Sequence, residues 1–206
     1  MKLKTSHILL IAVVGAVLGA AVGLWRGGSS PLLRTEAGQR ALQGALSATA
    51  PAPPQDLPVA RRGETVPTVR LPDLDGATVE VPGAYAGRPL LVNFWASWCG
   101  PCIEEMPELN RYAAGQNAGG KAGDGTQVVG IALDDADAVR EFLARIPVDY
   151  PVLIDRAGPR DSSVQLGNPR GVLPYSVLIS ADGRLLKQKV GPFQSGEIDG
   201  WATERD

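Results

Sequence analysis

Histidine and cysteine are almost absent from this chain of 206 residues, which has one histidine, His7, and two cysteines, Cys99 and Cys102. Because His7 lies near the N-terminus, the remaining residues contain no imidazole. This excludes a Ser-His-Asp or Cys-His triad, a His-ligated zinc site and a C-x-x-C-H haem attachment. Two cysteines cannot form a scaffold of several disulfides, and they supply only half of a cysteine zinc site. We therefore expect no metal.

Positive charge is also scarce in the part of the chain that is expected to fold. Residues 63–206 contain 13 Lys and Arg against 20 Asp and Glu, a net charge of −7, whereas the whole chain has a net charge of −2. Binding along nucleic acid requires clustered Lys and Arg side chains on the phosphates. We therefore expect no nucleic-acid partner.

Charged residues are missing altogether from residues 8–25, which follow Lys2 and Lys4. At about 1.5 Å per residue an 18-residue helix spans roughly 27 Å, close to the hydrocarbon thickness of a bilayer. The pattern favours an uncleaved transmembrane anchor, because the apolar run continues to Trp25. The alternative is a signal sequence cleaved after small residues such as those at 19–21. Both interpretations leave residues 1–7 in the cytoplasm and export the remainder.

Residues 26–62 are rich in Gly, Ala, Ser and Pro, and this composition predicts a flexible linker. Apolar residues at helical spacing within 35–47 predict one short helix in it. The expected organisation is an N-terminal region, an anchor or signal sequence, a linker and one folded domain, at residues 1–7, 8–25, 26–62 and 63–206.

Periodicity in residues 63–206 predicts an α/β domain with a mixed central sheet flanked by helices. Residues 68–71 and 78–81 alternate at strand period around the turn signal Asp75-Gly76, which predicts an N-terminal β-hairpin. Further strands are expected at 89–95, 127–133, 152–154, 175–179 and 184–190. Helices are expected from Pro101, with Pro107 inside, and at 135–145, and a glycine-rich loop is expected at 115–125.

The two cysteines lie in Trp98-Cys-Gly-Pro-Cys102, between a buried strand and the start of a helix. A helix N-terminus carries unpaired N–H groups and partial positive charge, which stabilise a thiolate at Cys99. The spacing lets Cys102 attack a mixed disulfide formed by Cys99. A purely structural disulfide is a poor alternative, because so short a loop constrains the unfolded chain little. The motif therefore predicts redox chemistry through the Cys99–Cys102 pair, without a cofactor.

The stretch from Val92 to Cys102, followed by Glu105-Met-Pro-Glu-Leu109, resembles membrane-anchored thioredoxin-like proteins of the TlpA/ResA type. The resemblance continues through residues 128–134 and 150–155 and covers about 68–191. It implies a thioredoxin-like fold, thiol–disulfide exchange and a location at the outer face of the bacterial inner membrane. Family members often serve cytochrome c maturation or other thiol reduction in the envelope.

The resemblance also implies residue roles. Pro174 matches the family's cis-proline, which pairs with the substrate beside the dithiol, although a trans proline opening a strand is the alternative from base rates. Leu173, before that proline, departs from the polar or β-branched residue of relatives. By the same resemblance the substrate-binding residues are Trp98, Gly100, Pro101, Leu173 and Pro174.

Glu105 follows Cys102 by three residues, on the same helix face, and matches a glutamate that relatives place near the active site. It is either an acid that exchanges protons with Cys102 or a solvated acid favoured by the helix dipole. Asn93 and Gly130 stand where cytosolic thioredoxins have a buried Asp–Lys pair, so another group must handle the proton of Cys102. Asp134 is a second candidate near the cysteines.

The predicted function is a membrane-tethered oxidoreductase that mainly reduces disulfides of exported proteins and is itself reduced by an integral-membrane thiol donor. The alternatives are a net oxidant or isomerase, or a redox-inert thioredoxin-fold binding module. If the N-terminal segment is cleaved, the domain is secreted to the periplasm.

Overall fold

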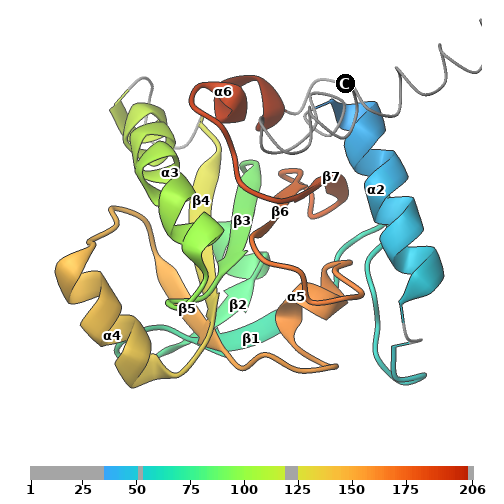
Figure 1. Ribbon diagram of the computed structural model, residues 1–206, viewed down its shortest axis with the longest axis horizontal. Coiled ribbons are helices and arrows are strands. Elements are labelled where there is room, and N and C mark those ends of the chain that lie inside the picture. Colours follow the sequence, from blue (N-terminus) through green and yellow to red (C-terminus); the bar gives the residue numbers. More distant parts are fainter. Residues whose placement is uncertain (1–34, 51–52, 119–124, 204–206) are drawn as a thin grey trace, which may run out of the picture. The chain divides into compact units, whose positions relative to one another are not determined.

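Figure 1 shows the protein as a computed structural model, which describes residues 35–50, 53–118 and 125–203. The predicted N-terminal region and the anchor or signal sequence lie outside these ranges. Within them, no helix is both long enough and apolar enough to cross a membrane. Contacts divide the chain into two compact units, Met1–Leu42 and Gln43–Asp206, and the second contains the dithiol.

The second unit is built on a mixed five-stranded sheet in the order β5-β4-β3-β6-β7. The central strand β3 pairs in parallel with β4 and antiparallel with β6. The strands of this sheet are β3 (Leu90–Trp95), β4 (Gln127–Leu133), β5 (Val152–Asp155), β6 (Tyr175–Ile179) and β7 (Leu185–Val190). Every residue of β3 is buried, which agrees with its continuous apolar sequence. The predicted mixed sheet is therefore confirmed.

A separate antiparallel hairpin of β1 (Val69–Pro72) and β2 (Thr78–Val81) confirms the predicted N-terminal extension. Its turn contains Gly76 at φ +86°, a conformation that glycine adopts without steric cost. The helical elements are α2 (Glu36–Thr49), η2 (Gly83–Tyr85), α3 (Gly100–Ala118), α4 (Ala136–Arg145), α5 (Ser162–Gln165) and α6 (Glu197–Trp201).

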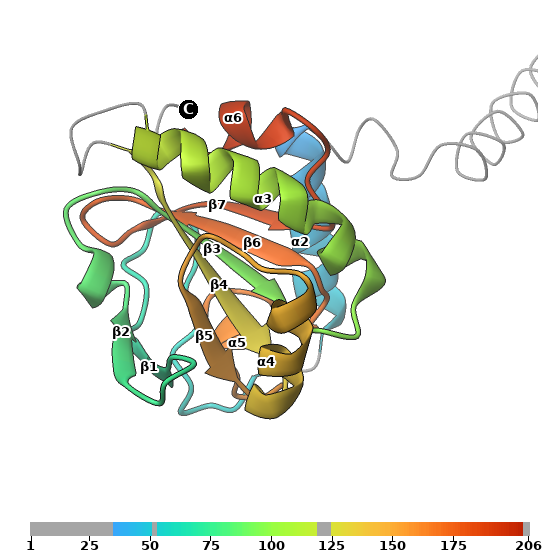
Figure 2. The ribbon, with the colours of Figure 1, turned by 90° about the vertical axis from the view of Figure 1, so that its left-hand side faces the viewer.

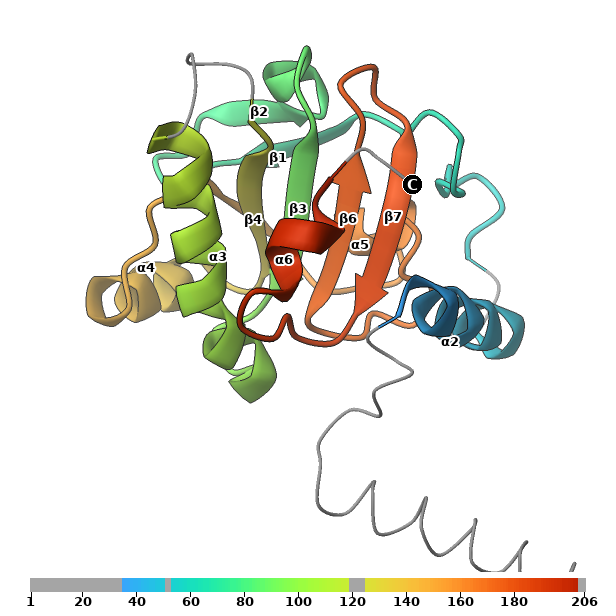
Figure 3. The same cartoon turned by 90° about the horizontal axis from the view of Figure 1, so that it is seen from above.

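The five-stranded sheet has a hydrophobic core on each face. One core joins α3, α4 and α6 to the sheet, and it includes both cysteines. The other joins the β1–β2 hairpin and Leu166, which follows α5, to the opposite face. Figure 2 shows α3 and α6 on one side of the sheet and the hairpin on the other, and Figure 3 looks onto the face that carries α3 and α6. The dithiol therefore belongs to the α3 side.

One predicted boundary was wrong. The loop expected from Gly115 begins later, because α3 continues to Ala118. A glycine costs a helix only about 1 kcal/mol, and burial of Tyr112 and Ala113 holds this part of the helix against the core. Near the end of the predicted linker, Ala60 is buried and its N–H donates to Gln165 O at 2.8 Å.

Candidate active site

The dithiol connects the end of β3 to the start of α3. Cys99 and Cys102 form a disulfide with an S–S distance of 2.02 Å and a Cα–Cα distance of 5.3 Å. Cys99 immediately precedes Gly100, the first residue of α3, so its sulfur is held at the positive end of the helix. Cys99 is 6% exposed and Cys102 is completely buried. The first cysteine is therefore the one that a partner reaches more easily.

The loop before the dithiol is held by Asp134, which follows β4. Its Oδ2 accepts hydrogen bonds from Ser97 N at 3.0 Å and from Ser97 Oγ at 2.6 Å, and its Oδ1 accepts one from Asp135 N at 2.8 Å. Burial acts to raise the pKa of Asp134, but these hydrogen bonds outweigh it and lower that pKa below its ordinary value. Asp134 is thus an ionised anchor for the loop, which it holds at Ser97, two residues before Cys99.

Pro174 lies beside the strand that leads to the dithiol. The Leu173–Pro174 bond is cis, as the resemblance implied, and Pro174 is buried. The antiparallel register pairs Phe94 on β3 with Tyr175 on β6, so the residue before Tyr175 lies next to the end of β3. The structure therefore places Pro174 beside the segment that continues into Cys99.

A groove of about 410 Å³ opens next to this proline segment. Trp98 and Leu173 both line it, and Trp98 has 69% of its surface exposed although it is a large aromatic side chain. Gly100 and Pro101 are also exposed, in the first turn of α3. An exposed aromatic side chain at the edge of a groove is typical of a surface that binds another protein. The predicted substrate-binding residues are thus all located near the dithiol.

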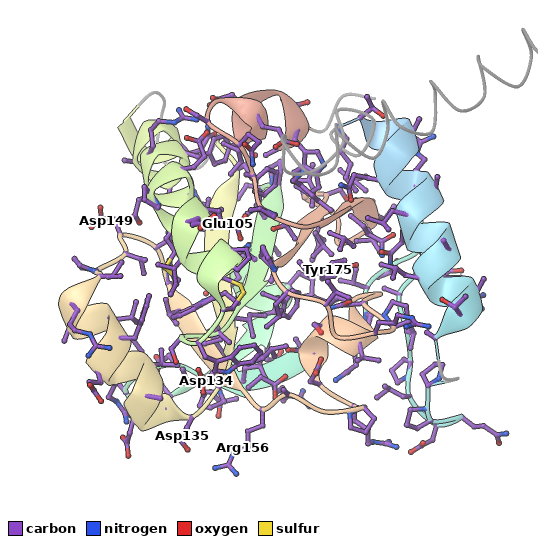
Figure 4. The ribbon with its side chains drawn as sticks, in the orientation of Figure 1. Glu105, Asp134, Asp135, Asp149, Arg156 and Tyr175 are labelled. Carbon is purple, nitrogen blue, oxygen red and sulfur yellow. A yellow bond between two sulfur atoms is a disulfide. The ribbon has the colours of Figure 1, made fainter. Side chains whose placement is uncertain are left out.

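Glu105 lies inside the protein, on the first turns of α3 (Figure 4). It is 1% exposed, so the interpretation as a solvated acid is wrong, whereas Glu104 beside it is exposed. Asn93 Nδ2 donates to Glu105 Oε1 at 2.8 Å, and Phe193 N donates to Glu105 Oε2 at 2.9 Å. Burial raises the pKa of Glu105 to about 7, although both hydrogen bonds oppose the shift. Near neutral pH this carboxyl can both accept and release a proton.

The segment that follows β7 holds the Phe193 amide in place. Lys189 Nζ forms an ion pair with Glu197 Oε1 at 2.8 Å and lies 5.2 Å from the centre of the Phe193 ring. The same ring packs edge to face on Trp201, with 5.1 Å between the ring centres. The charge of Lys189 also acts to lower the pKa of Glu105. The sequence analysis did not identify Phe193 as a partner of Glu105, because a backbone N–H donor has no sequence signature.

The redoxin family matches residues 61–202 of this chain. The chain is 34% identical over 150 residues to the thiol:disulfide interchange protein HelX of Rhodobacter capsulatus. This alignment covers 70% of this chain and 77% of HelX. It is 28% identical over 140 residues to the thiol-disulfide oxidoreductase ResA of Bacillus anthracis, covering 68% of this chain and 75% of ResA. A solved thiol-disulfide oxidoreductase from Bacteroides fragilis superposes with a TM-score of 0.56 at 25% identity, covering 67% of this chain and 96% of that one.

Proposed function

This chain belongs to the redoxin family, has a thioredoxin-like fold and is a thiol–disulfide oxidoreductase, and we propose that it works in the bacterial envelope, mainly reducing disulfides of exported proteins. The observation that carries the proposal is the dithiol at the start of α3 with a buried carboxyl, Glu105, three residues further along the same helix. The dithiol transfers the electrons, and we expect no other cofactor.

In the proposed reaction the Cys99 thiolate attacks one sulfur of the partner disulfide. A bond forms between Cys99 and that sulfur, and the other partner sulfur leaves as a thiolate. Cys102 then gives its proton to the Glu105 carboxylate and attacks Cys99, which releases the second partner sulfur as a thiolate. The partner gains two electrons, and the enzyme is left with the Cys99–Cys102 disulfide that is present in the structure.

Several groups support the partner-binding part of this proposal. Trp98 and Leu173 offer apolar surface in the groove beside the dithiol. Pro174 has no N–H group and its carbonyl accepts from Gly191 N, so we expect an extended substrate segment to pair with the backbone of Leu173 before it. Gly100 and Pro101 leave the approach to Cys99 unobstructed, since neither has a long side chain.

The residues between the cysteines support the proposed reducing direction. Gly100 and Pro101 place no cation beside Cys99, so the thiolate is stabilised only moderately, by the helix N-terminus. Strong oxidants in this chemistry have a much more stable thiolate, which favours their reduced form. We therefore propose a reductase that an integral-membrane thiol donor returns to the dithiol state.

The location is proposed from residues 1–25. Lys2 and Lys4 before a charge-free apolar run favour a single-pass anchor in the inner membrane, with the domain on the outer face. HelX of Rhodobacter capsulatus is named a thiol:disulfide interchange protein, and we propose that the partners here are exported proteins with disulfides, including those made during cytochrome c maturation.

Reduction of insulin disulfides by the reduced full-length protein tests the proposal. We expect turnover and a reduction potential nearer to about −270 mV, the value for thioredoxin, than to about −120 mV, the value for a strong periplasmic oxidant. A potential near the second value would instead identify a net oxidant or isomerase. No reduction of insulin would leave a redox-inert binding module. Trapping of mixed disulfides with Cys102→Ser then identifies the partners.

A further inference from the structure

Among the buried polar atoms that have no hydrogen-bond partner in the described part of the chain, three belong to residues that lie around Gly130 on the α3 side of the sheet. They are Asn93 Oδ1, Trp95 Nε1 and Tyr150 OH. Their side chains are at most 6% exposed. A buried polar group without a partner costs about 1–3 kcal/mol, so native proteins usually satisfy such groups with other residues or with internal water.

The three side chains converge around Gly130 on β4. A methyl group at Gly130 would lie 3.0 Å from Tyr150 Cε2 and 3.1 Å from Trp95 Nε1, so both side chains approach the same backbone position. Asn93 is paired with Gly130 in the register of β3 and β4. Because Gly130 has no side chain, the indole of Trp95 and the phenol of Tyr150 can both approach its backbone beside Asn93.

The orientation of Asn93 directs its oxygen toward this cluster. Its Nδ2 donates to Ser176 Oγ at 3.0 Å as well as to Glu105, and Ser176 lies on β6. Since β6 and β4 flank β3 on opposite sides, the amide oxygen is left on the side of β4. Trp95 supplies a donor, Asn93 an acceptor and Tyr150 a hydroxyl that does both, which matches the hydrogen bonds of a water molecule.

The proposed proton transfer from Cys102 to Glu105 requires a path between Glu105 and bulk water. Cys102 is completely buried and Glu105 is 1% exposed, so neither group exchanges protons with bulk water directly. Each oxygen of the Glu105 carboxylate accepts one hydrogen bond from a protein donor, so each oxygen keeps one lone pair available for another donor. Tyr150 lies near enough for the Glu105 charge to add to the effect of burial in raising the pKa of the phenol.

Tyr150 also lines a surface groove of about 430 Å³, which the β1–β2 hairpin, α4 and β5 enclose. The groove includes Asp73, which follows β1, and Leu143 on α4. It is separate from the groove that contains Trp98 and Leu173. Tyr150 thus stands between the interior beside Glu105 and an opening to solvent that is distinct from the groove beside the dithiol.

We propose that Asn93, Trp95 and Tyr150 bind internal water and relay protons between Glu105 and the groove of Asp73. The relay rests on the proposed role of Glu105. A proton taken from Cys102 by Glu105 passes through the bound water to the Tyr150 hydroxyl, which releases its own proton outward. The same path runs in reverse when the disulfide is reduced again. Tyr150 acts here as a positioning residue, since it touches neither the cysteines nor the partner.

Tyr150→Phe removes the hydroxyl and keeps the ring. We expect the single-turnover reduction of a protein disulfide to slow about tenfold, less than the roughly 100-fold or greater loss typical of a missing acid–base group. We also expect the solvent deuterium isotope effect to increase, because proton transfer then limits the rate. Tyr112→Phe is the matched control: it removes another hydroxyl from the α3 core, one that donates to Ala202 O at 3.3 Å, and it should leave the rate and the isotope effect unchanged.

The double variant Tyr150→Phe/Glu105→Gln separates the relay from the proposed function. If the relay acts through Glu105, the double variant should be no slower than Glu105→Gln alone. A slow Glu105→Gln with a wild-type rate and isotope effect for Tyr150→Phe would overturn the relay and retain the acid. In the wild type, the indole N–H of Trp95 should show a magnetisation transfer from long-lived internal water by NMR, and no such signal would also overturn the relay.

Discussion

Asn93 donates a hydrogen bond from its side-chain amide to Glu105 Oε1 across 2.8 Å in the buried core behind the dithiol. An aspartate at position 93 would place a second carboxylate against the first, and at least one of the two would have to stay protonated. The amide instead stabilises the charged form of Glu105 without adding charge. In the proposed mechanism Glu105 therefore serves as the acid, at a site where the resemblance places the Asp of cytosolic thioredoxins at position 93.

Glu105→Gln should change the titration of the thiols. The negative charge of Glu105 disfavours a neighbouring thiolate, so its removal should lower the apparent thiol pKa of the reduced protein. It should also slow single-turnover reduction of a protein disulfide, because Cys102 loses its proton acceptor. Thiolate absorbance against pH and rapid-mixing kinetics measure the two effects. Glu104→Gln, on the exposed side of the same turn, should change neither, and an unchanged Glu105→Gln would remove this acid from the mechanism.

The stability of the oxidised protein should also depend on Glu105. Its pKa is about 7 in the folded protein and 4.5 as its ordinary value, so the folded state binds the proton more tightly. The contribution of this proton to the free energy of unfolding is complete below pH 4.5 and is lost as the pH rises through 7. The change is on the order of 3 kcal/mol. Denaturant unfolding should show Glu105→Gln gaining stability relative to wild type over this range. A difference that is constant with pH would contradict the raised pKa.

Asp134→Ala should loosen the loop before Cys99. It removes the acceptor of three hydrogen bonds, from Ser97 N, Ser97 Oγ and Asp135 N. We expect a loss of about 1–3 kcal/mol in the free energy of unfolding and faster amide exchange at Ser97. Since the pKa of Asp134 is lowered, its contribution is present above the ordinary carboxyl pKa and disappears as the pH falls.

Asp137→Ala is the control for Asp134, because it also removes a carboxylate near the start of α4. Asp137 forms an exposed ion pair with Arg140, and such pairs contribute about 0–1 kcal/mol. Its removal should leave amide exchange at Ser97 as in the wild type. Equal effects of the two substitutions would mean that Asp134 does not anchor the loop.

Cys99 should be alkylated before Cys102. Cys99 is 6% exposed and precedes the helix, whereas Cys102 is buried within its first turn. The helix N-terminus should lower the pKa of the Cys99 thiol, so a limiting amount of iodoacetamide at mildly acidic pH should label this residue first. Peptide mass spectrometry identifies the labelled cysteine, and preferential labelling of Cys102 would reverse the assigned roles.

The N-terminal segment predicts an exported, tethered domain. Alkaline phosphatase fused after Arg62 should be active, and the native protein should sediment with membranes, because residues 8–25 are apolar and follow Lys2 and Lys4. Substitution of Val17 and Leu18 by arginine should abolish both results, since charges at a helix centre in the bilayer are costly. A mature N-terminus near Val22 would instead establish a cleaved signal sequence.

Much of the fold could be predicted from local patterns. The Asp75-Gly76 turn between alternating residues predicted the β1–β2 hairpin, and the apolar run at 89–95 predicted the buried strand β3. The end of α3 could not be predicted, because Gly115 is a weak helix breaker and the packing of Tyr112 and Ala113 decided the boundary. Burial of Ala60 likewise depends on Gln165, more than a hundred residues further along the chain.

The sequence by itself determined the reactive pair, because the spacing of Cys99 and Cys102 and their position before a helix are local properties. Only the tertiary structure decided what Glu105 is. The same residue on an isolated helix would be a solvated acid with an ordinary pKa. Folding buries it beside Asn93 and against the Phe193 amide, 88 residues away. A pKa reports the surroundings of a group rather than its identity, and those surroundings come from segments that are distant in the chain.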